Sequence, residues 1–299
     1  MAIIPFDQRE GTIWLNGALL PWGDAKVHVL THGLHYGSSV FEGERFYAGR
    51  VFKLKAHGER LINSCRIMGM DCPYSADELD EAAQEVIRAS GLSDGYLRRV
   101  IWRGSGMMGV AAQDSGLNVA MASWEWPSYF TPDALEAGLR LTISDWRRPP
   151  PDCAPTQAKA AGLYMICTLS KHAAEQAGYD DALMFDHRGL VAEATGANVF
   201  FVKDGALHTP DPDCFLNGIT RQTVMELAQR RQIRVIERAI RPDELEGFEQ
   251  CFLTGSAAEV CPVSQIGPYR FDVGDITKQM VRDYHDEVRR LPGDRSAVA

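Results

Sequence analysis

Long hydrophobic runs are absent from this sequence of 299 residues. A membrane-spanning helix needs about 20 consecutive apolar residues, so we expect no membrane partner. The N-terminal residues also lack the basic flank and the apolar stretch of a secretory signal. We therefore expect a protein that works in the cytoplasm.

Paired cysteines and an excess of positive charge are absent as well. The seven cysteines form an odd set without a Cys-x-x-Cys pair, which argues against a disulfide framework and against a zinc knuckle. The 31 Lys and Arg residues are outnumbered by 40 Asp and Glu residues, and the formal net charge is −9. That balance disfavours a nucleic-acid groove, and we expect no nucleic-acid partner.

The composition is that of a folded globular protein, with 45% hydrophobic and 24% charged residues. Helical and strand periodicities both occur without strict alternation, which predicts an α+β fold. Pro127 and Pro132 interrupt the strand pattern. We expect a small N-terminal domain over residues 1–126, a linker over 127–136, and a larger C-terminal domain over 137–299 that carries the reactive lysine described below.

The periodicity assigns most of the elements. Helices are predicted over 53–70, 76–90, 162–178, 220–231, 242–248 and 276–291. Strands are predicted over 96–102, 117–126, 139–146, 181–186, 190–195, 235–240 and 250–254, with a hairpin over 198–209 that turns at Asp204-Gly205.

Three short motifs suggest other functions. Gly104-Ser-Gly-Met-Met-Gly109 fits a dinucleotide-binding pattern, but the residues after it are too few and too polar for the required helix. Gly91-Leu-Ser-Asp-Gly95 fits a hydrolase pattern, but a helix precedes it and a strand follows, which is the reverse of that motif's context. His28, His32 and His35 have neither an obvious helix nor the Glu of a metal-binding pair. We expect none of these functions and no metal site.

Lys159 and Glu193 are the first candidates for chemistry. Lys159 lies in Ala158-Lys-Ala-Ala-Gly162, where small neighbours leave room for a bulky group. Glu193 is the single carboxylate in a predicted strand of small and apolar residues. A buried charge without a partner is unfavourable, so this carboxylate should have one.

Two turns could hold an anion. Gly218-Ile-Thr220 precedes a predicted helix and could present backbone N–H groups, and Ser256 lies in a tight turn with a hydroxyl. Each turn alone is a weak signal. Together with an amine and a carboxylate, they supply what pyridoxal phosphate requires.

With these residues the sequence resembles the fold-type IV pyridoxal-phosphate aminotransferases, and most closely the branched-chain amino acid aminotransferases. The resemblance extends from Trp14 to Val263. Its most specific segments are residues 32–45, 159–164, 193–198, 218–221 and 254–259. It implies a two-domain α+β architecture and a homodimer or higher homo-oligomer, with cofactor and substrate enclosed where the domains meet.

The resemblance also implies a role for each matching residue at the cofactor. Lys159 would form a Schiff base with it and then move a proton between the substrate α-carbon and C4′. Glu193 would keep the pyridine nitrogen protonated, and Tyr164 would hydrogen-bond the phenolate oxygen. The residues implied for the phosphate and the rest of the cofactor site are Arg60, Asn198, Leu216, Gly218, Ile219, Thr220 and Ser256.

The implied substrates are amino acids and 2-oxo acids, in particular Leu, Ile and Val with 2-oxoglutarate. An aliphatic side chain would meet aromatic and apolar residues, the α-carboxylate would meet the 256–258 turn and Tyr96, and Arg residues would accept the γ-carboxylate of glutamate. The implied substrate residues are Tyr36, Phe41, Gly43, Arg45, Tyr96, Arg98, Met108, Val110, Trp126, Tyr129, Ser256, Ala257 and Ala258.

Other functions fit the same fold less well. The nearest rival is a D-amino acid or (R)-amine transaminase. D-amino acid relatives commonly carry Arg-x-His where this chain has Arg98-Arg-Val100, and the missing His disfavours this rival. An aminodeoxychorismate lyase fits less well because the aliphatic-pocket pattern is intact. A cofactor-binding regulator without catalysis is disfavoured by the complete set of Lys159, Tyr164 and Glu193. Two departures, Ala197 before Asn198 and Ser256 in place of the usual Thr, bear on substrate breadth.

Overall fold

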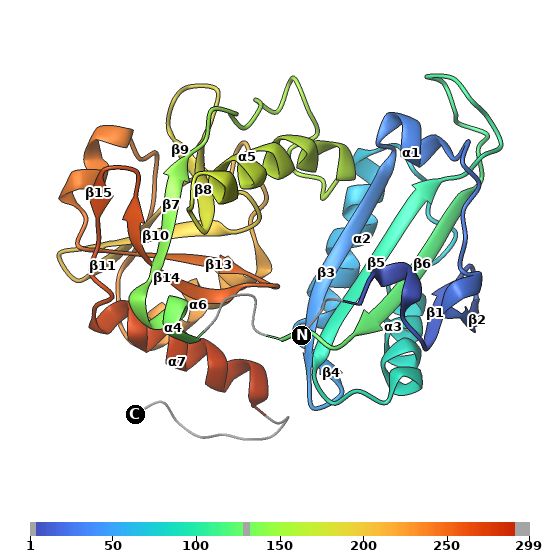
Figure 1. The fold of residues 1–299 in the computed structure, drawn as a ribbon, viewed down its shortest axis with the longest axis horizontal. Helices are drawn as coiled ribbons and strands as arrows, with labels where there is room; N and C mark the ends of the chain where they lie inside the picture. Colours follow the sequence, from blue (N-terminus) through green and yellow to red (C-terminus); the bar gives the residue numbers. More distant parts are fainter. Residues whose placement is uncertain (1–3, 128–131, 291–299) are drawn as a thin grey trace. The chain divides into compact units, whose positions relative to one another are not determined.

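The chain folds into two compact units, shown in a computed structural model that describes residues 4–127 and 132–290 (Figure 1). The first unit comprises Met1–Pro127 and Ala158–Gly162, and the second comprises Ser128–Gln157 and Leu163–Ala299. Each unit combines a β-sheet with helices, which confirms the α+β class. Within the described ranges, no helix is both long and apolar enough to cross a membrane.

The first unit is built on an antiparallel sheet of six strands in the order β2-β1-β6-β5-β3-β4. Its elements are η1 (Phe6–Gln8), β1 (Thr12–Leu15), β2 (Ala18–Pro21), η2 (Trp22–Asp24), α1 (His32–Tyr36), β3 (Ser39–Tyr47), β4 (Arg50–Val51), α2 (Leu54–Ile67), α3 (Ala76–Ser90), β5 (Gly95–Arg103) and β6 (Leu117–Trp124). Helices α2 and α3 pack against this sheet (Figure 1).

Helix α3 shows how local sequence sets the element boundaries. The Ser75 hydroxyl accepts a hydrogen bond from the Glu78 N–H, and the Glu78 carboxylate accepts one from the Ser75 N–H, which forms a capping box. Gly91 ends the helix in the left-handed conformation, with φ 66°. The apolar residues between them, including Leu79 and Val86, are buried.

Among its described residues the second unit contains nine strands, and six of them close into a ring. The pairing order is β12-β11-β10-β13-β14-β7-β8-β9, with β15 beside β14, and β9 pairs again with β10. Its elements are α4 (Pro132–Ala137), β7 (Leu139–Ile143), η3 (Ala161–Leu163, its first two residues in the first unit), α5 (Tyr164–Gln176), β8 (Asp181–Phe185), β9 (Val191–Ala194), β10 (Asn198–Lys203), β11 (Ala206–Thr209), α6 (Ile219–Arg230), β12 (Val235–Glu237), η4 (Pro242–Gly247), β13 (Gln250–Gly255), β14 (Glu259–Ile266), β15 (Tyr269–Arg270) and α7 (Asp275–Arg289).

The ring encloses an apolar core. Leu141, Leu183, Val199, Leu253 and Val263 come from five of its strands and are fully or almost fully buried. Helix α5 packs on β8, and α6 and α7 pack on each other and against β13 and β14. The ring closes where Asn198 of β10 pairs with Glu193 of β9. Closure therefore places one predicted site residue directly beside another.

The lysine segment lies in a different unit from the one expected. Residues 158–162 belong to the first unit, whereas the sequence suggested a C-terminal domain that includes Lys159. The reason is hydrogen bonding to β3 and α2: the Phe41 N–H donates to the Lys159 carbonyl at 3.1 Å, and the Lys159 N–H donates to the Ser64 hydroxyl at 3.0 Å. Of the expected linker 127–136, residues 128–131 lie outside the described residues, and α4 begins at Pro132.

Candidate functional site

Five of the predicted substrate residues lie on one face of the first unit's sheet. Phe41, Gly43 and Arg45 alternate along β3, and the register pairs Gly43 with Arg98 and Arg45 with Tyr96 on β5. Because side chains alternate between faces along a strand and match across a strand pair, all five share one face. Residues between them, such as Glu42, are buried on the other face.

Gly43 is required by the closeness of Tyr96. A Cβ atom at Gly43 would lie 1.8 Å from the Tyr96 hydroxyl oxygen, so only glycine leaves room for the ring. Arg98 donates a hydrogen bond to that hydroxyl at 3.2 Å and lies over the Phe41 ring at 4.6 Å from its centroid. Trp126 stacks on Tyr96 with ring centroids 4.9 Å apart. The guanidinium of Arg98 therefore lies beside the rings of Phe41 and Tyr96.

On this face, two guanidinium N–H groups have no partner among the described residues. The Nε atoms of Arg45 and Arg98 are buried and have no hydrogen-bond acceptor among the described residues. A buried donor without an acceptor is unfavourable by about 1–3 kcal/mol. This arrangement suits a bound carboxylate, which offers acceptors in the geometry of a guanidinium.

Lys159 presents its amine to the same face. Its Nζ lies 4.9 Å from the centroid of the Phe41 ring. Burial lowers the pKa of Lys159 to about 8, the Arg60 guanidinium acts in the same direction, and Glu42 and Tyr96 oppose the shift. An amine with this pKa is partly neutral near physiological pH and can attack a carbonyl group.

Arg60 projects from α2 onto a buried carboxylate. Its guanidinium donates to both oxygens of Glu42, at 2.6 and 2.8 Å, and His57 lies 2.7 Å from the same carboxylate. Burial acts to raise the pKa of Glu42, but Arg60 and His57 hold it well below the ordinary value. Arg60 is thus fixed in place by Glu42 from β3.

Tyr36, Met108 and Val110 form a separate group in the first unit. Tyr36 lies at the end of α1 and stacks on His32 at 4.5 Å, and His32 hydrogen-bonds the Gly109 carbonyl at 2.8 Å. The short helix α1 is itself a correction, because we expected no helix around these histidines. The side chains of Tyr36, Met108 and Val110 are exposed. Tyr129 lies outside the described residues.

Glu193 in the second unit is held by polar neighbours. The Asn198 amide donates to its carboxylate at 3.2 Å, and the Arg148 Nε lies 3.4 Å from it as an ion pair without hydrogen-bond geometry. Burial acts to lower the pKa of Arg148, but Glu193, Cys167 and Tyr164 beside it raise that pKa. The Arg148 cation therefore lies beside the Glu193 carboxylate. Tyr164 is the first residue of α5.

Asn198 also connects Glu193 to the start of α6. Its amide donates to the Leu216 carbonyl at 3.0 Å, and its Oδ1 accepts the Gly218 N–H at 3.1 Å. A Cβ atom at Gly218 would lie 2.2 Å from that Oδ1, so this contact requires glycine. Ile219 and Thr220 begin α6, where first-turn N–H groups have no helical acceptor and face an anion favourably.

The second turn lies beside the ring closure. Ser256, Ala257 and Ala258 connect β13 to β14, and Gly255 approaches the Gly196 carbonyl so closely that a Cβ atom would lie 3.2 Å from it. Thr254, the register partner of Asn198, is 1% exposed, and its hydroxyl has no hydrogen-bond partner among the described residues. A buried hydroxyl of this kind suits a polar ligand.

These groups fit the cofactor expected from the sequence. In the second unit, the donor set at the start of α6 and at Thr254 suits a phosphate, and the Glu193 carboxylate suits a protonated ring nitrogen. In the first unit, the amine of Lys159 suits an aldehyde.

Sequence reasoning missed the residues that support these groups. Glu42 and Arg148 look like ordinary surface charges in the sequence, yet both are almost fully buried. Arg221 is also fully buried and donates to Asn217 and Glu237, which fixes the loop before α6. In the sequence, each of these residues is visible only as a single charged residue. A single charged residue does not reveal which distant residue it contacts.

Comparison with known proteins gives a consistent result. Residues 39–266 match the family model described as amino-transferase class IV. A protein of Rickettsia felis named "probable branched-chain-amino-acid aminotransferase" is 43% identical over 97% of both chains. The branched-chain amino acid aminotransferase of T.th., solved with pyridoxamine 5'-phosphate, has a TM-score of 0.91 and 38% identity, covering 94% of this chain and 96% of that one. The branched-chain aminotransferase of Thermoproteus uzoniensis, solved with norvaline, has a TM-score of 0.89 and 35% identity, with coverage of 94% and 95%.

Proposed function

The chain belongs to the amino-transferase class IV family, and from this membership we propose that it transfers the amino group of branched-chain L-amino acids to 2-oxoglutarate. The products are branched-chain 2-oxo acids and glutamate. The relatives and the solved structures carry names of this activity. The observation that supports it most is the sheet face of the first unit, where aromatic rings lie beside two buried arginines with unmet donors.

The family resemblance assigns each of the following groups a part in holding the cofactor. Arg60 and the N–H groups of Ile219 and Thr220 bind its phosphate, together with the hydroxyl of Ser256. Glu193 holds a proton on its ring nitrogen, and Tyr164 binds its phenolate oxygen. When bound, pyridoxal phosphate supplies an aldehyde that attaches to an amine and a cationic ring that withdraws electrons.

The protein's own groups then perform the proton transfer. With the cofactor bound, the Nζ of Lys159 would act as the general base that takes the substrate α-proton. Glu193, paired with Arg148, would offer a carboxylate to the protonated ring nitrogen of the bound cofactor. Asn198 keeps Glu193 and the 216–218 loop in fixed positions. Lys159 would then deliver this proton to C4′ of the cofactor.

Substrate choice would follow from the sheet face. Phe41, Tyr96 and Trp126 would exclude water from an aliphatic substrate side chain. An apolar pocket distinguishes two substrates that differ by one methylene group by about 1–3 kcal/mol. The Nε–H groups of Arg45 and Arg98 would donate hydrogen bonds to the γ-carboxylate of glutamate or 2-oxoglutarate. The same pocket therefore takes an apolar side chain in one half-reaction and a carboxylate in the other.

A substrate panel tests this function. The purified holoenzyme should form glutamate from 2-oxoglutarate with L-leucine, L-isoleucine and L-valine. D-alanine, an (R)-amine and aminodeoxychorismate should give little or no product. Activity with D-alanine or the (R)-amine and none with the three L-amino acids would assign the chain to the rival function.

The amine of Lys159 should capture the cofactor with an unusual pH dependence. Only the neutral amine attacks an aldehyde, and a lowered pKa extends the neutral form to lower pH. When apoprotein is mixed with pyridoxal phosphate, the rate of absorbance change should rise tenfold per pH unit and level off near pH 8. A rate that still rises above pH 10, as for an ordinary lysine, would contradict this environment for Lys159.

Gly43→Ala should damage substrate binding. The new methyl group would overlap the Tyr96 hydroxyl, so Tyr96 and its bond to Arg98 must move. We expect KM for L-leucine to rise at least tenfold and the free energy of unfolding to fall by about 1–3 kcal/mol. Gly116→Ala is the matched control, because a Cβ atom there meets nothing within 4 Å. Equal KM values for the two variants would refute the packing role of Gly43.

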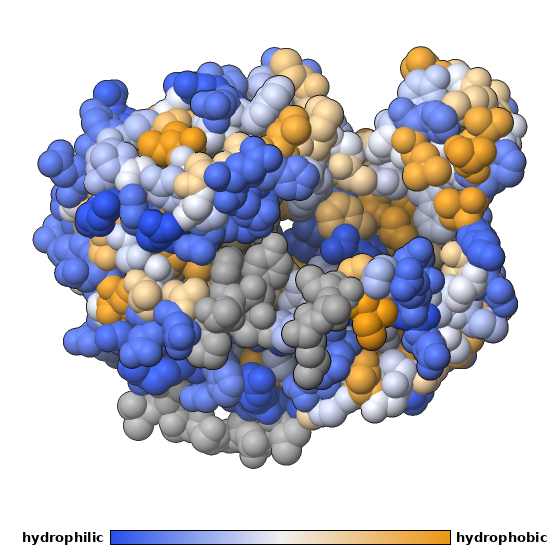
Figure 2. Space-filling view, in the orientation of Figure 1, coloured by the Kyte–Doolittle hydropathy of each residue, from blue (hydrophilic) through white to orange (hydrophobic). Residues whose placement is uncertain are grey.

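We also propose a homodimer that works in the cytoplasm. The first unit exposes many apolar side chains around α1 and the β5–β6 loop (Figure 2), among them Val29 at 71% and Val110 at 86%. Contiguous exposed apolar surface is typical of an interface. The seven cysteines are free thiols, which fits a reducing compartment. Sedimentation equilibrium should give twice the chain mass, and a monomer would contradict the proposal.

A further inference from the structure

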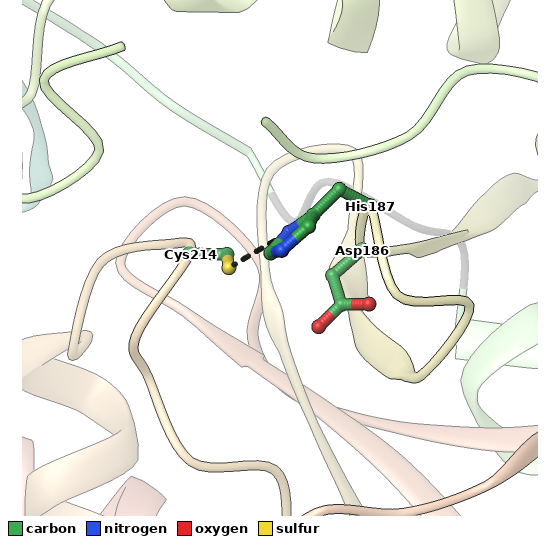
Figure 3. A group of neighbouring side chains, drawn as sticks. All are labelled: Asp186, His187 and Cys214. Atoms are coloured by element: carbon green, nitrogen blue, oxygen red, sulfur yellow. Dashed lines mark hydrogen bonds between the residues drawn. The ribbon is translucent and has the colours of Figure 1, made fainter. Parts of the chain in front are cut away.

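A cluster of three metal-binding residue types lies in the second unit, outside the residues used above. Asp186 and His187 follow β8, and Cys214 lies in the loop after β11. The Cys214 Sγ is 3.6 Å from the His187 Nδ1, and an Asp186 carboxylate oxygen lies within 4.8 Å of both donor atoms (Figure 3). Asp186 and Cys214 are buried, whereas His187 is exposed.

The sulfur–nitrogen separation matches a shared metal ion. Zinc lies about 2.3 Å from a thiolate and about 2.0–2.1 Å from an imidazole nitrogen, so a tetrahedral angle places the two donors about 3.6 Å apart. Cys214 and His187 already have this separation. In the absence of metal, the same distance fits a weak hydrogen bond between the thiol and the ring.

Arg188 contacts the third candidate ligand, Asp186. Its guanidinium lies 2.6 Å from the Asp186 Oδ2, and the other oxygen of Asp186 accepts the N–H groups of Arg188 and Leu190. Arg188 also lies 2.7 Å from Asp213 and is 45% exposed. It can therefore keep its contact with Asp213 while the Asp186 Oδ2 turns to a metal ion.

The local charges favour a divalent cation once the thiol is ionised. On metal binding, the Cys214 thiol would release its proton to solvent as the metal–sulfur bond forms. Asp186, Asp213 and the thiolate, less Arg188, then carry a net charge of −2 by formal count.

We propose that Asp186, His187 and Cys214 bind one divalent ion of the zinc type, with water as a fourth ligand. Thiolate, imidazole and carboxylate together favour zinc or cobalt over magnesium or calcium. The ion would join the β8–β9 turn to the loop that leads into α6. The proposal does not depend on transamination.

Cobalt titration of the tag-free holoenzyme tests the site, because a thiolate bound to Co²⁺ gives an intense near-ultraviolet band. We expect one equivalent of Co²⁺ per chain and displacement by Zn²⁺. Cys214→Ser should abolish the band, and His187→Ala, a change at an exposed residue, should weaken binding at least tenfold. Arg188→Gln should strengthen binding several-fold by removing the competing cation.

Cys153→Ser is the control, because Cys153 is an exposed thiol of the same unit. That variant should keep the band unchanged. A band that persists in Cys214→Ser would overturn the proposal, as would its absence from both the wild-type protein and Arg188→Gln. Equal affinity of His187→Ala and wild type would also overturn it.

Discussion

Lys159→Ala is expected to abolish transamination and to remove the visible absorbance of the purified protein. Lys159 supplies both the amine that attaches the cofactor and the base that removes the α-proton, and general-base catalysis alone contributes about 10²–10⁴-fold. We therefore expect turnover with L-leucine to fall at least 10⁴-fold. Glutamate formation and the absorbance spectrum, measured before and after borohydride, report the two roles.

Lys55→Ala provides the comparison for this result. Lys55 is an exposed lysine of α2 in the same unit, so its loss removes a charge without removing the buried amine. Its activity and absorbance should match those of the wild type. Borohydride-sensitive absorbance that persists in Lys159→Ala would show that another amine carries the cofactor.

Glu193→Gln is expected to slow α-proton removal while the cofactor stays bound. The amide keeps the size of the side chain and can still accept the hydrogen bond from Asn198, but it cannot hold a proton on the ring nitrogen as an ion pair. Loss of one electrostatic contact to a developing charge reduces turnover by about 10²–10³-fold. Turnover of L-leucine and of L-leucine deuterated at the α-carbon measures this step.

The isotope effect distinguishes loss of this role from general damage. In Glu193→Gln, proton removal should limit turnover, so the isotope effect should rise toward its full value. Glu175→Gln alters an exposed carboxylate that pairs with Lys171 at 3.6 Å, and surface pairs contribute little. It should behave as wild type. A normal rate and an unchanged isotope effect in Glu193→Gln would refute the role of Glu193.

Elements with strong local signals could be predicted from the sequence. The capping box of Ser75 and Glu78 and the glycine at position 91 mark the ends of α3. The hairpin turns at Asp204 and Gly205, as expected, and both residues have positive φ. These boundaries depend on residues within a few positions of one another, so no tertiary information was needed.

Strand β3 could not be predicted because its buried face carries charge. Glu42 pairs with Arg60 and His57, and Glu44 pairs with Arg99 at 2.5 Å. The usual alternation of apolar and polar residues is therefore absent. A buried carboxylate is tolerated only where a partner reaches it, and the partners come from α2 and β5. No local pattern reveals contacts between such distant segments.

In the candidate site, too, some residues could be predicted from the local sequence and others only from contacts in the fold. Lys159, Glu193 and the Gly218 turn stand out in the sequence because each breaks its local pattern. Pairing of β9 with β10 brings Asn198 to Glu193. Arg148 reaches Glu193 from the loop after β7, where its N–H donates to the Phe185 carbonyl of β8. Sequence motifs thus identify the groups expected to react, whereas the fold identifies the groups that position them.

The half-reaction with L-leucine alone tests the proposed function most directly, because it needs no second substrate. The holoenzyme, mixed with excess L-leucine, should release one equivalent of 4-methyl-2-oxopentanoate per chain and lose its visible absorbance. D-leucine should do neither. Release of the 2-oxo acid from D-leucine but not from L-leucine, or from neither, would contradict the account.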